Sequence, residues 1–347
     1  MMDHKDRFFP ITLHFLIVMV VVCFICIGVV LGSILVGENI HQPIMAFTSN
    51  RSGTDQIYLL DQTSRLSRQI TETSKASSTS AWSSRQALAF ASLAPLHISI
   101  LDSQLTHVSP LSQDQSWNDY QPNWSPSGDL AVTTDRSANW DIMIYPPSQT
   151  PFAAPFNTPN NELAPCWWPD GSLSFVSDRD GGMDIYRYDF ANKTTENLTN
   201  DPSNDYNPAC SANGQLAFTT TRDMNAEIYV MNLKTGETKN VTNNHASDFY
   251  PAWLPDGNLS FVSDRDGNRE IYVLDMATRQ LTNISQNPAN DEQPAWTSCH
   301  MRTMIEVEAR FRLPRLDTAV AIFGERRTQI STNIRREIRV IRIYAFI

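Results

Sequence analysis

The chain has 347 residues, of which 27 are Lys or Arg and 37 are Asp or Glu, so its formal net charge is −10 at pH 7. Residues 299–347 carry a local charge of +5, which leaves −15 for the rest of the chain. Because contacts to phosphate groups require Lys and Arg, this acidity argues against nucleic acid as a partner.

The first predicted element is an apolar segment over residues 8–37, which contains no Asp, Glu, Lys or Arg. A membrane-spanning helix needs about 20 apolar residues, whereas the core of a cleaved signal peptide has about 7–15. We therefore predict one transmembrane anchor at 8–37, with a cleaved signal as the alternative. Lys5 and Arg7 precede this segment and Glu38 follows it. By the positive-inside rule, we expect residues 1–7 in the cytoplasm and the part of the chain after the anchor on the extracytoplasmic side.

Residues 38–298 contain a repeat of 43 residues that is marked by five prolines. These are Pro122, Pro165, Pro208, Pro251 and Pro294. Each unit has a turn such as 168–171, followed by short β-branched and aromatic runs such as 173–176 and 184–188. A fourth short run precedes the next proline. Four strands in about 40–45 residues are typical of one blade of a β-propeller.

Six blades are predicted, because one apolar position of the second strand recurs six times. It is occupied by Phe47, Phe90, Val132, Phe175, Phe218 and Phe261. The first unit has no inner strand before Ile44, and the strand that ends at Trp296 has no turn after it. We therefore predict an all-β, six-bladed propeller closed by pairing of these two terminal strands, which removes the free edges.

The full unit reads Pro-x-Trp-x-Pro-Asp-Gly, Leu-x-Phe-x-Ser-Asp-Arg-Asp-Gly, Asp/Glu-Ile-Tyr and Leu-Thr-Asn, and it is complete at 165–199 and 251–283. This unit resembles the WD40-like repeat of the TolB propeller family over about residues 40–298. The family repeat occurs in periplasmic scaffolds, peptidase propellers and sensor ectodomains, so the resemblance implies the fold and leaves the function open. TolB proteins carry an α/β domain before the propeller, where this chain has the apolar segment. A role in the Tol–Pal envelope system is therefore not carried over.

Charged residues recur at two places in the unit. An acid stands three residues before each proline, and an arginine stands fourteen after it or at the matching place in the first unit. The acids are Asp119, Glu162, Asp205, Asp248 and Asp291, and the arginines are Arg51, Arg136, Arg179, Arg222 and Arg265. In a propeller the two loops open on the same face, so acids and arginines should meet around one mouth of the channel. They either pair within or between adjacent blades to hold the loops, or they form a polar rim that binds a peptide or a charged group of a partner.

The second unit departs from this pattern. Its loop over 91–97 is two residues shorter than the corresponding loop of the fourth unit and lacks the arginine. We expect a notch in the rim, lined by Leu93, Leu96 and His97. The notch is either ordinary drift of one repeat or a place where a sixfold ring binds something asymmetric.

Catalytic and metal-binding motifs are not evident. The chain contains no Gly-x-Ser-x-Gly elbow, and its histidines stand at unrelated offsets of the repeat. Residues 178–184 resemble a calcium loop only in part, because the bidentate Glu is missing. Cys166 and Cys210 occupy different offsets, so we expect no disulfide framework. No cofactor or metal is predicted.

Residues 299–347 form a basic tail outside the repeat, in which 338–344 could be one extended strand. The tail is a partner- or membrane-binding segment, a poorly ordered extension, or translated sequence foreign to the ancestral gene. For the whole chain we predict a single-pass membrane protein with an extracytoplasmic propeller that binds or scaffolds proteins without catalysis. The alternatives are a sensor or accessory subunit of an envelope enzyme or transport complex, and a hydrolase with an unrecognised site on the propeller face.

Overall fold

The computed structural model describes residues 43–72, 76–93, 96–112 and 116–297, together with two short strands in the tail. The chain divides into two units, Met1–His300 and Met301–Ile347. In the second unit, β25 (Val307–Glu308) pairs antiparallel with β26 (Arg342–Ile343). The latter strand lies inside the predicted extended segment 338–344, and the rest of the tail lies outside the described residues.

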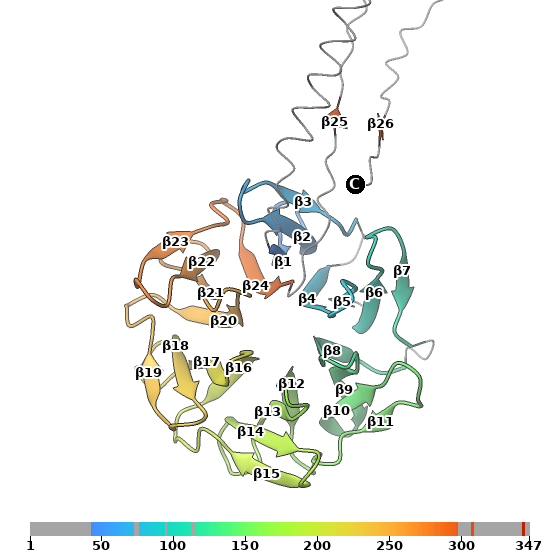
Figure 1. The fold of residues 1–347 in the computed structure, drawn as a ribbon, viewed down its shortest axis with the longest axis vertical. Coiled ribbons are helices and arrows are strands. Elements are labelled where there is room, and N and C mark those ends of the chain that lie inside the picture. The colour runs from blue at the N-terminus through green and yellow to red at the C-terminus, as the bar shows by residue number, and fades with distance from the viewer. Residues whose placement is uncertain are drawn as a thin grey trace, which may run out of the picture. The chain divides into compact units, whose positions relative to one another are not determined.

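The first unit contains six four-stranded antiparallel sheets arranged as a ring (Figure 1), which confirms the predicted six-bladed propeller. We number the blades along the chain. Blade 1 consists of β24 (Asp291–Trp296), β1 (Ile44–Ser49), β2 (Gln56–Asp61) and β3 (Ser67–Gln69). Blade 2 consists of β4 (Ser77–Trp82), β5 (Leu88–Ser92), β6 (His97–Leu101) and β7 (Val108–Pro110). Blade 3 consists of β8 (Asp119–Trp124), β9 (Leu130–Ser137), β10 (Asn139–Tyr145) and β11 (Phe152–Ala153).

The last three blades continue the same pattern from the inner strand outward. Blade 4 consists of β12 (Glu162–Trp167), β13 (Leu173–Ser177), β14 (Asp184–Asp189) and β15 (Thr194–Asn197). Blade 5 consists of β16 (Asp205–Cys210), β17 (Gln215–Thr220), β18 (Glu227–Asn232) and β19 (Thr238–Asn240). Blade 6 consists of β20 (Asp248–Trp253), β21 (Leu259–Ser263), β22 (Glu270–Leu274) and β23 (Leu281–Asn283).

Blade 1 closes the ring in the way the sequence predicts. Its inner strand β24 pairs antiparallel with β1, so that Met45 lies opposite Trp296. Beyond this ladder, the Thr297 N–H donates to the Ile44 carbonyl at 3.0 Å, and the Ile44 N–H donates to Thr297 Oγ1 at 3.2 Å. The two ends of the repeat region therefore share one sheet.

The hydrophobic core lies in layers between neighbouring blades. The recurrent second-strand phenylalanines are 0–1% exposed. Phe218 of blade 5, for example, packs with Trp168, Val176 and Ile185 of blade 4. A strand buried on both faces explains why these runs read as continuously apolar rather than alternating.

Five of the six inner strands contain a β-bulge at the periodic proline, and β4 of blade 2 has no proline. The residue before the proline has a positive φ of 48–55° at Gln121, Ala164, Asn207, Tyr250 and Gln293. The register shifts across the same residues, as between Tyr120 and Asn123. Proline has no N–H to donate, and a bulge leaves a residue unpaired, so the proline costs no ladder hydrogen bond there.

In the part of the chain that the structure describes, no helix is long and apolar enough to cross a membrane. The predicted anchor at 8–37 lies outside the described residues.

Candidate functional site

The predicted acids and arginines form five ion pairs, one in each blade except blade 2. The acid opens the inner strand, and the arginine follows the second strand of the same blade, except that Arg136 lies near the end of β9. The nitrogen–oxygen distances are 2.6 Å for Arg51–Asp291, 3.1 Å for Arg136–Asp119, 2.9 Å for Arg179–Glu162, 3.1 Å for Arg222–Asp205 and 3.0 Å for Arg265–Asp248. The acid side chains are at most 3% exposed and the arginines 17–24%.

Each arginine also has further contacts that fix its position. The Arg179 guanidinium lies 5.1 Å from the Phe175 ring and 4.7 Å from the Tyr186 ring, and its Nε donates to Ser177 Oγ at 3.1 Å. Comparable ring contacts hold Arg51, Arg222 and Arg265. Each ion pair thus holds two loops of a blade together. This agrees with the first interpretation of the sequence, in which acids and arginines pair to hold the loops.

Burial dominates the electrostatics of three of the five acids. It raises the pKa values of the Asp205, Asp248 and Asp291 carboxyls, although the paired arginines and neighbouring hydroxyls act in the opposite direction. Only the outer edges of the arginines face solvent. A role of these five ion pairs in recognising a partner stays a prediction.

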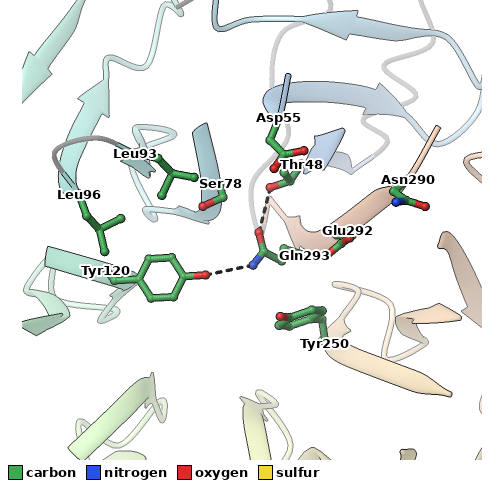
Figure 2. Close-up of a pocket in the computed structure, with 10 residues that line it drawn as sticks. All are labelled: Thr48, Asp55, Ser78, Leu93, Leu96, Tyr120, Tyr250, Asn290, Glu292 and Gln293. Carbon is green, nitrogen blue, oxygen red and sulfur yellow. Dashed lines mark hydrogen bonds between the residues drawn. The ribbon is translucent and has the colours of Figure 1, made fainter. Parts of the chain in front are cut away.

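A cavity of about 360 Å³ opens on the same face, between the inner strands of blades 1, 2, 3 and 6 (Figure 2). Ten residues line it. They are Thr48, Asp55, Ser78, Leu93, Leu96, Tyr120, Tyr250, Asn290, Glu292 and Gln293.

Gln293 organises the polar side of the cavity. Its Oε1 accepts from Thr48 Oγ1 at 3.0 Å and from the Thr79 N–H at 2.9 Å, and its Nε2 donates to the Tyr120 hydroxyl at 3.4 Å. Figure 2 shows the Tyr120 and Tyr250 rings on opposite sides of this group. Burial raises the pKa of both tyrosines, so both hydroxyls are protonated at neutral pH.

The notch predicted in blade 2 contributes to the cavity. Leu93 and Leu96, which flank the shortened loop between β5 and β6, line it. His97 begins β6, and its Nδ1 is buried without a hydrogen-bond partner in the described part of the chain, but it is not among the lining residues.

Most of the cavity residues were missed by reading the sequence. Tyr250 and Gln293 occupy the bulge position before the periodic proline, and Tyr120 lies one residue earlier in its own blade. These positions differ between blades, whereas the predicted site residues are mostly ones that repeat. The signal that could have found them is the pair of variable residues directly before each periodic proline.

The expectation that Cys166 and Cys210 stay unpaired was wrong. The structure joins them in a disulfide with a Cα–Cα distance of 6.0 Å. Neighbouring inner strands meet at residues 44 apart, one more than the repeat; the Trp167 N–H, for example, donates to Asn123 Oδ1 across the same 44-residue spacing. The differing offsets that argued against a disulfide are therefore those that bring the two sulfurs together.

Two acids of the partial calcium loop at 178–184 accept hydrogen bonds from other groups of the protein. Asp178 accepts from the Asn161 backbone and side chain, and Asp180 accepts from the Tyr186 hydroxyl. Across the described ranges, no group of three or more His, Cys, Asp or Glu side chains could hold a metal ion.

Comparisons with known proteins agree with the repeat unit. Residues 206–305 match the family model described as the TolB beta propeller domain. Comparison with curated proteins gives no match. TolB from Acinetobacter baumannii superposes with a TM-score of 0.65 at 18% identity, covering 75% of this chain and 67% of that one.

Two further solved structures have the same fold. The putative TolB from Agrobacterium tumefaciens has a TM-score of 0.55 at 18% identity, over 70% of this chain and 88% of that one. A chain of a nidogen/laminin complex has a TM-score of 0.60 at 10% identity, over 74% of this chain and 98% of that one. At these identities the likeness shows a shared fold.

Proposed function

We propose, from the premise that residues 43–297 form a TolB-like β-propeller, that this chain is a non-catalytic protein-binding or scaffold module on the extracytoplasmic side of a membrane. Residues 8–37 are the proposed anchor.

The observation that carries this proposal is the asymmetric cavity on a rigid face. Five of the six blades hold their loops with a buried ion pair, whereas blade 2 replaces the pair with Leu93 and Leu96 at the cavity wall. A preformed surface loses little conformational entropy when it binds. Such a face suits recognition of a partner in one orientation.

The location is supported by the Cys166–Cys210 disulfide, because structural disulfides persist in oxidising compartments and are rare in the cytosol. Protein binding is supported by the nidogen/laminin complex, one chain of which matches this fold over 98% of its length.

The proposal is tested by photocross-linking of the full chain in its native membrane. One variant carries a photoreactive residue at Asn290, at the cavity, and a control carries it at Glu196, which is exposed on the outer strand β15. We expect a stoichiometric protein adduct from position 290 and none from 196, also when residues 299–347 are deleted. A folded chain that yields no adduct from either position would contradict a protein-binding role.

A further inference from the structure

We propose that the cavity binds an organic cation on an aliphatic stem, of the kind carried by a lysine side chain or a simple alkylamine. This proposal deepens the proposed function. It rests on the proposed function in the case that a protein partner supplies the cation.

Asp55 provides the charge that this ligand would meet. Its carboxylate lines the cavity and makes no hydrogen bond or ion pair to any residue in the described ranges. The second acid of the cavity, Glu292, is already paired with Arg269 at 2.9 Å. Within the described ranges, Asp55 is therefore a negative charge at the cavity without a cationic partner.

Two aromatic rings make the same place favourable for a cation. Tyr120 and Tyr250 both line the cavity, and Figure 2 shows the Tyr120 hydroxyl directed toward Gln293 with Tyr250 beside the same group. The faces of aromatic rings attract cations within about 6 Å, and more strongly where water is excluded.

Leu93 and Leu96 provide the apolar wall for an aliphatic stem. They flank the one loop of its kind that has no arginine in the sequence, since residues 93–96 read Leu-Ala-Pro-Leu. In the other five blades an arginine edge faces solvent and would repel an approaching cation. The volume of about 360 Å³ is at the lower end for ligand sites, which fits a single side chain or a small amine.

The test is calorimetric titration of the full chain with Nα-acetyl-lysine amide, with the neutral Nα-acetyl-norleucine amide as the matched ligand. We expect saturable binding of the lysine derivative alone. Asp55→Asn should weaken it about tenfold or more, because a hydrogen bond to a charged group is lost. Glu196→Gln, which removes an exposed acid on β15, should leave it unchanged. Leu96→Lys places a tethered ammonium at the cavity and should abolish it.

Equal binding of the norleucine derivative, an Asp55→Asn variant that binds normally, or no binding by the folded wild type would each overturn the proposal. Titration with n-butylamine separates the two sources of the cation. Equal affinity for butylamine indicates a free amine, whereas a clear preference for the lysine amide indicates a peptide.

The cross-linking experiment distinguishes this proposal from the proposed function. A partner adduct that forms equally in wild type and Asp55→Asn supports the binding module and contradicts recognition through a cation. Binding of the lysine derivative without any protein adduct supports the cation site and contradicts the protein-binding role.

Discussion

Removal of the disulfide between blades 4 and 5 should lower the stability of the propeller substantially. Cys166 and Cys210 are 44 residues apart, so the bond closes a loop of that size in the unfolded chain. In the chain-entropy account, closing a loop of about 45 residues contributes about 4 kcal/mol at 25 °C. With a urea m-value of about 3 kcal/mol/M, this corresponds to a decrease in the unfolding midpoint of about 1.3 M.

The assay compares urea unfolding of the full chain, followed by tryptophan fluorescence, with and without reductant. The double variant Cys166→Ala/Cys210→Ala is the control, because it should unfold at the lower midpoint and be insensitive to reductant. Alkylation in denaturant without reductant should label only the other three of the five cysteines. Labelling of all five cysteines, or an unchanged midpoint on reduction, would refute the reasoning.

Three further predictions concern the ion pairs and the closure of the ring. Arg265→Met leaves the buried Asp248 without its counter-charge and should lower the free energy of unfolding by about 3 kcal/mol. Arg187→Met breaks the more exposed pair with Asp170 and should lower it by less than about 1 kcal/mol. Similar costs for both variants would contradict a structural role of the five ion pairs. Burial raises the pKa of the Asp248 carboxyl, so its contribution is fully present below the unfolded pKa and is lost as pH rises through the folded pKa. The free energy of unfolding of wild type relative to Asp248→Asn should therefore be greater near pH 4 than near pH 7, as measured by urea unfolding at both pH values. The opposite trend would show that burial does not dominate the pKa of Asp248. Trp296→Ala removes a buried ring from the closing blade and should cost about 3–5 kcal/mol in urea unfolding, against about 0.5 or less for the more exposed Trp117→Ala; equal effects would contradict the closure argument.

The blades and their closure could be predicted because they depend on patterns that recur in the sequence. A second-strand phenylalanine such as Phe218 must be apolar in every unit, since it is buried between blades. The strand ending at Trp296 was recognisable as a partner for the strand at Ile44 because each lacked its neighbour. The proximity of acids and arginines followed from the same regularity, whereas the sequence left open whether they pair within or between blades.

The cavity and the disulfide could not be predicted in this way. The cavity depends on residues that break the repeat, such as Tyr250 and Gln293, and on four blades that meet only in three dimensions. The disulfide depends on the 44-residue spacing between neighbouring inner strands, which a period of 43 does not reveal. The anchor at 8–37 and most of the tail lie outside the described residues and stay predictions.

The geometry of the closing blade also determines how the ring responds to mechanical force. The chain enters β1 at Ile44 and leaves β24 at Trp296, and these ends lie at the same end of an antiparallel ladder. Tension applied through both flanks would load the terminal hydrogen bonds first, so β1 and β24 would separate bond by bond like a zipper. A ladder pulled from opposite ends would instead share the load among all its bonds. Blade 1 is therefore the seam at which the ring opens under tension, while the ladders of the other five blades bear no direct load.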